Sequence, residues 1–271
     1  MVSEGRGQYM NNVNKTLYIP LYGKSYVSKK GIILDDKKAE EIWGKEGFSL
    51  KGKSKSKYLA YYMGMRSKVF DNWVKEQIQN TEDDIVLHIG CGMDSRVLRV
   101  GKENCKWYDI DFPDVIKERK RYYGENENYQ MIASDARQAE WLQNIEKEKK
   151  AIVIMEGISM YLQIEELKAL LKALKNHFKE IVILMDCYTT FAAKASKYKN
   201  PINDVGVTVV YGLDEPKILE DGTGISFFKE HEMTPVEMID ELKGMEKAIF
   251  KKVYAGKISK KMYRLYEFTS A

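Results

Sequence analysis

Residues 85–92 read IVLHIGCG, an apolar run of five residues that ends in a glycine turn. A short continuous apolar run is typical of a strand buried on both faces of a parallel sheet. The two glycines allow a sharp turn and let the backbone approach a ligand without a Cβ in the way. This stretch therefore predicts the first strand of an open α/β sheet with a ligand at residues 90–92, although an ordinary strand-to-helix turn would look the same.

Strand and helix signals alternate after this turn. Such alternation, with nearly continuous apolar strands, indicates a mostly parallel sheet that is covered by helices on both faces. Further strands are expected at Trp107–Ile110, Tyr129–Ala133, Ala151–Met155 and Glu180–Met185. Helices are expected at Ser95–Val100, from Pro113 to Tyr123, and at Ile164–Phe178.

The regions around this sheet have other patterns. Apolar residues at helical spacing over Tyr58–Ile78 predict that residues 1–80 form a helical N-terminal region that caps the sheet. Residues 81–271 would then be the main domain. Three of the five prolines lie in residues 188–246, which predict a lid insertion with a helix near Val236–Leu242. Alternating residues in Lys247–Tyr254 and Met262–Phe268 predict an antiparallel C-terminal hairpin, linked through residues 255–259.

Composition limits the kinds of partner. The 44 basic and 40 acidic residues are interleaved, which favours a solvated surface over a nucleic-acid interface. The basic run at residues 51–57 is expected to be a solvated loop, with phosphate contact as the alternative. No window approaches the roughly 20 apolar residues of a membrane span, and three dispersed cysteines suggest neither disulfides nor zinc. We therefore expect a cytoplasmic protein with no metal, no membrane and no nucleic-acid partner.

Acidic residues follow several of the expected strands. Asp109 and Asp111 end the second strand about 20 residues after the turn, where a carboxylate can accept the hydroxyls of a ribose. Ser95 stands where a dinucleotide fingerprint has its third glycine, and no P-loop follows the first strand. These features favour a nucleoside over a dinucleotide or a triphosphate.

Asp135 and Glu156 follow the third and fourth strands and would line the same edge of the sheet. Each alone is more often a helix cap or turn residue than a ligand-binding one. Together they suit an adenosine with a methionine tail, because Asp135 can accept the adenine amino group and Glu156 can bind an ammonium group. Arg66 falls on the apolar stripe of its helix, so it is either paired with a protein carboxylate or reserved for the carboxylate of that tail.

Four ordered motifs make the pattern specific: IGCGMDSR at 89–96, DIDFP at 109–113, SDAR at 134–137 and EGISMYL at 156–162. They resemble the successive motifs of the leucine carboxyl methyltransferase family. The resemblance covers roughly residues 58–185. It implies a class I methyltransferase (Rossmann-like) fold and S-adenosylmethionine as cofactor. The cofactor-binding residues that it implies are Arg66, Gly90, Gly92, Asp111, Asp135, Ala136 and Glu156.

Two positions depart from the family pattern, which usually has Glu at Asp109 and Leu at Ala136. Asp109 keeps the charge, and Ala136 would act through its backbone. The resemblance implies methyl transfer to an oxygen atom, either a carboxylate or a hydroxyl of a small molecule. A protein C-terminal carboxyl methyltransferase and a non-catalytic cofactor sensor are the alternatives. A nucleic-acid methyltransferase is disfavoured, because EGIS at residues 156–159 replaces the Asn/Asp-Pro-Pro-aromatic sequence typical of base amino methylation.

Two further residues are candidates for catalysis. Tyr161 follows the fourth strand and is expected either to border the methyl site or to pack beneath the lid. A hydroxyl acceptor needs a general base, whereas a carboxylate is already ionised. His231 is the histidine considered for this role, because His88 lies inside a strand and His177 near a helix end. An ordinary surface position is the alternative for His231.

Overall fold

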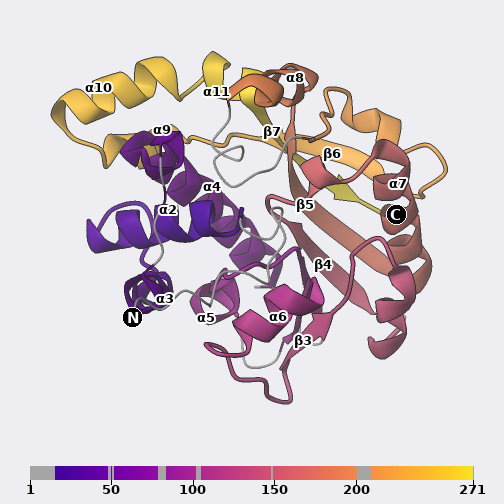
Figure 1. Cartoon of the computed structure of the whole chain (residues 1–271). Coiled ribbons are helices and arrows are strands. Elements are labelled where there is room, and N and C mark those ends of the chain that lie inside the picture. The colour runs from indigo at the N-terminus through magenta and orange to yellow at the C-terminus, as the bar shows by residue number, and fades with distance from the viewer. Residues whose placement is uncertain are drawn as a thin grey trace.

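The computed structural model describes residues 16–47, 50, 52–78, 84–101, 105–147, 149–199 and 209–270. The described part of the chain is built on one seven-stranded sheet with the order β3-β2-β1-β4-β5-β7-β6 (Figure 1). Strands β1 to β5 are parallel, and β7 runs antiparallel to both β5 and β6. The strands are β1 Ile85–Ile89, β2 Lys106–Asp111, β3 Tyr129–Ala133, β4 Lys150–Met155, β5 Glu180–Tyr188, β6 Ser226–His231 and β7 Tyr263–Thr269. The predicted fold class is confirmed.

Helices cover both faces of this sheet. In Figure 1 the N-terminal helices α2, α3 and α4 lie on one side of the sheet and α7 lies on the other. The α-helices are α2 Tyr18–Lys29, α3 Lys37–Glu46, α4 Lys57–Ile78, α5 Arg96–Val100, α6 Pro113–Arg119, α7 Ile164–His177, α8 Thr190–Lys199, α9 Val236–Asp240, α10 Gly244–Val253 and α11 Lys257–Met262. The 3-10 turns are η1 Gly52–Lys55, η2 Ala139–Asn144, η3 Ser159–Tyr161 and η5 Pro216–Leu219.

The apolar strands bury both faces because successive side chains point to opposite sides. In β1, Val86 packs in the cluster formed with α2 and α4, whereas Ile85 and Leu87 pack in the cluster formed with α7. Every residue of β1 is buried. This double burial explains why the sequence shows an unbroken apolar run instead of an alternating one.

The strand order reverses next to β1. From β1 the chain proceeds outward to β2 and β3, then returns to place β4 on the other side of β1. The loops after β1 and β4 therefore leave in opposite directions and open a crevice at the carboxyl ends of the strands. The predicted ligand turn at residues 90–92 lies at this crevice.

The expected C-terminal hairpin is wrong in one of its two strands. Residues 244–253 form α10 instead of a strand, and most of the predicted link belongs to α11. Met245, Ile249 and Val253 are spaced four residues apart, so this segment also carries a helical apolar stripe that the alternating pattern concealed. The partner of β7 is β6, which lies inside the expected insertion at 188–246. Residues 200–208 of that insertion lie outside the described residues.

Smaller differences concern single elements. Helix α6 ends at Arg119 rather than at Tyr123. Part of the basic run, expected to be a loop, forms η1, whose Lys55 carbonyl accepts a hydrogen bond from the Tyr22 hydroxyl at 3.4 Å. Lys51 lies outside the described residues. No helix in the described ranges is long and apolar enough to cross a membrane.

Candidate active site

A cavity of about 620 Å³ opens at the crevice beyond β1, β2 and β4. Residues 90–94 after β1, residues 111–112 after β2 and residues 156–158 after β4 line one side of it. The other walls come from α2, α4, α8 and the stretch 253–263. Its volume falls within the range of small-molecule pockets.

The glycine turn borders this cavity with a backbone that favours glycine. Gly90 has φ +74° and Gly92 has φ +51°, a region that residues with a Cβ rarely adopt. A Cβ on Gly90 would lie 2.9 Å from the Cβ of Ile158, so packing also excludes a larger residue there. The turn thus presents bare backbone to the cavity, as the sequence predicted.

Asp111 is held by backbone groups on both of its carboxylate oxygens. Gly92 N–H donates to Oδ2 at 2.8 Å, and Phe112 N–H donates to Oδ1 at 2.7 Å. Burial raises the pKa of Asp111 to about 6, despite these hydrogen bonds. Each oxygen keeps acceptor capacity, so the carboxylate can bind two hydroxyls of a ligand in the cavity.

Asp109, two residues earlier, has a different environment. Its side chain is fully buried, pairs with Arg119 at 2.5 Å and accepts hydrogen bonds from Tyr129 at 2.6 Å and Trp107 at 2.9 Å. It does not line the cavity. The carboxylate of Asp109 therefore fixes β2 to α6 and β3, and leaves Asp111 as the acid that faces the ligand.

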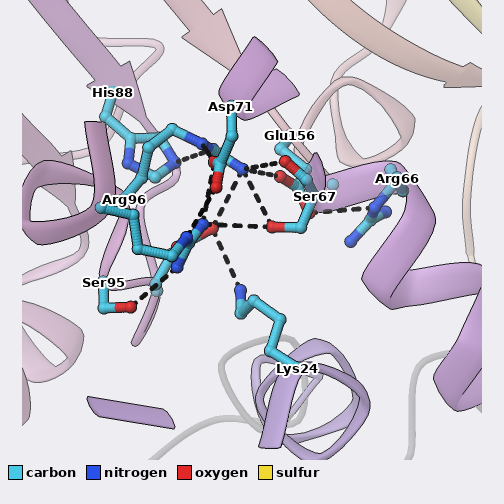
Figure 2. Close-up of polar contacts among 12 residues, drawn as sticks. Lys24, Arg66, Ser67, Asp71, His88, Ser95, Arg96 and Glu156 are labelled. Atoms are coloured by element: carbon cyan, nitrogen blue, oxygen red, sulfur yellow. Dashed lines mark hydrogen bonds and ion pairs between the residues drawn. The ribbon is translucent and has the colours of Figure 1, made fainter. Parts of the chain in front are cut away.

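Arg66 and Glu156 meet in the cavity wall (Figure 2). Arg66 Nε lies 3.0 Å from Glu156 Oε1, and Arg66 Nη1 donates to Asp186 Oδ2 at 2.8 Å. Arg96 Nη2 contacts the other Glu156 oxygen at 2.5 Å. Burial would raise the pKa of Glu156, but the charges of Arg66 and then Arg96 lower it to about 2. The site therefore keeps an ionised carboxylate between two guanidinium groups.

Asp186, near the end of β5, was not predicted from the sequence. It follows the apolar residues 181–185 of that strand, as Glu156 follows β4, so the same signal identifies it. Gly157 N–H donates to Asp186 Oδ1 at 2.6 Å. Burial raises the pKa of Asp186, with Arg66 opposing that shift. Arg66 is thus anchored by two carboxylates from adjacent strands, and its buried Nε makes no hydrogen bond among the described residues.

A larger buried network supports this pair. Lys24 on α2 contacts Asp94 after the glycine turn at 3.0 Å, and Arg96 contacts Asp71 on α4 at 2.7 Å. Figure 2 shows Arg96 between Asp71, His88 and Glu156. The linked cations are Lys24, Arg66, Arg96 and Arg99, and the linked anions are Asp36, Asp71, Asp94, Glu156 and Asp186. Four cations against five anions leave one negative charge when all are ionised, which suits a ligand of net positive charge.

Two predicted residues lie away from the cavity lining. Asp135, after β3, accepts hydrogen bonds from the Arg137 side chain at 2.9 and 3.0 Å. Ala136 is buried in the cluster that contains Trp141. Neither residue lines the cavity, so the structure does not bring them together with Arg66 and Glu156.

The two catalytic candidates, Tyr161 and His231, differ in their position relative to the cavity. Tyr161 lines the cavity, whereas His231 does not. His231 lies on the edge strand β6, and its Nε2 is 2.5 Å from Glu267 Oε2 on β7. The ring of His231 is thus paired with a neighbouring strand, and the structure does not bring it together with Tyr161 at the cavity.

The half of the cavity beyond the strand ends is aromatic. Tyr62, Tyr161, Tyr188 and Tyr263 all line it, and the rings of Tyr188 and Tyr263 meet edge to face at 4.5 Å. The Tyr62 hydroxyl and the Ser259 hydroxyl are 2.9 Å apart. These residues come from four separate elements, so sequence spacing alone could not place them together. No group of three His, Cys, Asp or Glu side chains in the described ranges is arranged to hold a metal ion.

Comparison with known proteins places the chain in context. The model of the leucine carboxyl methyltransferase family matches residues 14–175. The tetracenomycin polyketide synthesis O-methyltransferase TcmP of Streptomyces glaucescens is 25% identical over 241 residues, which cover 88% of this chain and 89% of that protein. The S-adenosyl-L-methionine-dependent methyltransferase dpfgK of Gibberella zeae is 24% identical over 234 residues, 78% of each chain.

Solved structures share the fold at low identity. Magnesium protoporphyrin IX methyltransferase of Synechocystis PCC 6803, solved with bound S-adenosylhomocysteine, has a TM-score of 0.52 at 13% identity and covers 95% of this chain and 100% of its own. Geranyl diphosphate C-methyltransferase of Streptomyces coelicolor A3(2) has a TM-score of 0.52 at 12% identity, covering 83% and 86%. Both support the class I methyltransferase fold.

Proposed function

We propose that this chain, which belongs to the leucine carboxyl methyltransferase family, transfers a methyl group to an oxygen atom of a small molecule. The chain is an S-adenosylmethionine-dependent methyltransferase. The observation that carries the proposed substrate class is the cavity of about 620 Å³, which joins the charged strand ends to an aromatic half. The similarity to a polyketide O-methyltransferase supports an oxygen acceptor.

The residues of the charged half fit the cofactor. The backbone of Gly90 and Gly92 would lie beneath the methionine part, and Asp111 would accept the ribose hydroxyls. The guanidinium of Arg66, which lines the cavity, would bind the cofactor carboxylate, and Glu156 would bind its ammonium group. The single negative charge of the buried network matches a ligand that carries a sulfonium, an ammonium and one carboxylate.

Adenine recognition would involve the residues that follow β3. Asp135 and Ala136 follow β3 on the same side of the sheet as Asp111, because parallel strands end at one edge. Asp135 is engaged by Arg137, an exposed side chain that can move aside at low cost. We propose that this stretch contacts the adenine once Arg137 shifts.

The side chains that line the cavity favour a methyl acceptor that is already ionised. Bound S-adenosylmethionine supplies an electrophilic methyl group, and the protein aligns the acceptor oxygen with it. The buried His88 lies 3.3 Å from Arg96 and 3.4 Å from Asp109, and burial lowers its pKa. Of the cavity acids, Asp94 and Glu156 are paired with cations, and Asp111 would be engaged by the ribose hydroxyls. A carboxylate acceptor requires no base, and Tyr161 would border its oxygen.

The test combines binding with turnover. Isothermal titration with S-adenosylmethionine should give one site per chain. Release of S-adenosylhomocysteine should then be measured with a panel of aromatic carboxylic acids, phenols and peptides ending in a free carboxylate. Turnover on a small acid or phenol supports the proposal. Turnover on the peptides alone would identify a protein carboxyl methyltransferase, and binding without any turnover would favour a cofactor sensor.

A further inference from the structure

Helix α10 presents three side chains, spaced four residues apart, toward α4. Residues at this spacing share one face of a helix. Glu246 begins the row, Phe250 is fully buried in its middle, and Tyr254 at the end lines the cavity. Tyr254 stacks on Tyr58 of α4 with ring centres 5.6 Å apart, and Phe250 meets Tyr61 edge to face. One face of α10 therefore connects the molecular surface to the cavity wall.

Glu246 is the polar anchor of this face. Its carboxylate accepts hydrogen bonds from Tyr61 at 2.5 Å, from Lys57 at 2.7 Å and from Lys30 at 3.1 Å. Lys57 and Tyr61 belong to α4 and Lys30 directly follows α2, while Glu246 lies almost 190 residues after Lys57 in the chain. The hydrogen bonds from Lys57 and Tyr61 lower the pKa of Glu246 to about 2, so the anchor stays charged.

The segment continues into α11, and residues 244–262 together are called the arm. Ile258, Ser259 and Met262 of the arm line the cavity beside Tyr254. The other side of the arm faces solvent, since Met245 is 78% exposed and does not line the cavity. Figure 1 shows α10, in yellow, at the edge of the molecule near α2 and α9. The arm is thus a thin wall between the aromatic half of the cavity and water.

Glycines with positive φ stand at the start of each arm helix. Gly244 has φ +52° and Gly256 has φ +57°, and a Cβ at either position would meet nothing within 4 Å. Glycine is therefore suited here by its backbone torsion and not by close packing. Backbone changes at such positions are the usual way in which a loop or lid swings.

We propose that the arm is the door through which ligands enter the cavity, and that Glu246 is the positioning residue that holds it closed against α2 and α4. The inference rests on the proposed function in taking the cavity as the methyl-transfer site. Lys30 and Lys57 are more than one third exposed, so their ion pairs are weak, whereas the hydrogen bond from the buried Tyr61 is charge-assisted. A closure of this modest strength allows the door to open during each catalytic cycle.

The test uses Glu246→Gln, which keeps the shape and removes the charge. Asp240→Asn is the matched control, because Asp240 pairs with Lys247 of the arm at 2.9 Å and with no residue of α2 or α4. Amide hydrogen exchange over residues 244–262 of the ligand-free protein should be about tenfold faster in Glu246→Gln and unchanged in the control. Exchange in β1 and β4 should stay as in the wild type.

Binding kinetics with S-adenosylhomocysteine distinguish faster opening of the arm from damage to the binding site. In stopped-flow fluorescence, Glu246→Gln should raise the association and dissociation rates together, each by about tenfold, with the dissociation constant changed less than about twofold. A rise in the dissociation rate alone, or unchanged hydrogen exchange in the arm, would contradict the proposal that the arm opens to admit ligands. If the wild type does not bind S-adenosylhomocysteine, the proposed function fails, while the hydrogen-exchange result still decides whether Glu246 holds the arm.

Discussion

Replacing Arg66 with methionine tests the buried charge arrangement most directly. The guanidinium is 3% exposed and contacts Glu156 and Asp186, while methionine has a similar length and no charge. In the variant Glu156 keeps Arg96 at 2.5 Å, but Asp186 keeps only its hydrogen bond from Gly157. Asp186 thus becomes a buried carboxylate without a cation.

The expected loss follows from this single unpaired charge. Removing one partner of a buried ion pair costs about 3–5 kcal/mol. Burial already raises the pKa of Asp186, so the carboxyl can take up a proton and limit the cost to about 3 kcal/mol at pH 7. Arg66, together with Arg96, also lowers the pKa of Glu156 from 4.5 to about 2, so the Arg66 share of that stabilisation is present above about pH 4.5 and is lost as the pH falls toward 2. The difference between wild type and variant should shrink across this window.

The assay is urea unfolding followed by tryptophan fluorescence at pH 7 and pH 4. Arg137→Met is the control, because that arginine is 46% exposed and its pair with Asp135 should contribute less than about 1 kcal/mol. Adding Asp186→Asn to Arg66→Met should recover about half of the lost free energy of unfolding, since the unpaired charge is removed. A loss below about 1 kcal/mol for Arg66→Met, or no recovery in the double variant, would refute the reasoning.

Three further outcomes are expected. Gly90→Ala should lower the free energy of unfolding by about 1–3 kcal/mol, because Gly90 has a φ of +74° and an added Cβ would lie 2.9 Å from Ile158. The same variant should show no S-adenosylhomocysteine binding in calorimetry. Adding Ile158→Ala should restore part of the stability. The affinity of the wild type for S-adenosylmethionine should fall between pH 7 and pH 5 as Asp111, with a pKa of about 6, takes up a proton, whereas Asp111→Asn should bind more weakly and independently of pH in this range. His231→Ala should leave kcat within about twofold of the wild type, since its ring is held by Glu267 outside the cavity; a loss of a hundredfold would restore it as a base.

The parallel strands were the most predictable part of the fold. The bounds of the interior strand β1 and of the edge strand β3 agree with the sequence prediction to the residue, because both appear as short runs rich in apolar residues between turn signals. The failure at residues 247–254 has the opposite cause. An edge element with one exposed face carries few apolar residues, and here they satisfied both a strand and a helix pattern.

The positions of the cavity acids could also be predicted from the strand pattern, whereas the cations that pair with them could not. Asp111 and Glu156 directly follow apolar strands, and the parallel sheet brings such positions to one edge. Lys24 and Asp94 are 70 residues apart within an evenly mixed charge pattern, where surface and buried ions look alike. Only the packing of α2 over the glycine turn reveals that they form a buried pair.

The contact between Lys24 and Asp94 also constrains how this sequence can diverge. The two side chains are 3% and 6% exposed, so a relative that loses one of them keeps the other as a buried charge without a partner. Substitutions at positions 24 and 94 should therefore be inherited as matched sets, and an alignment of relatives should show them covarying. Position 24 should then change more slowly among relatives than the less buried positions of α2.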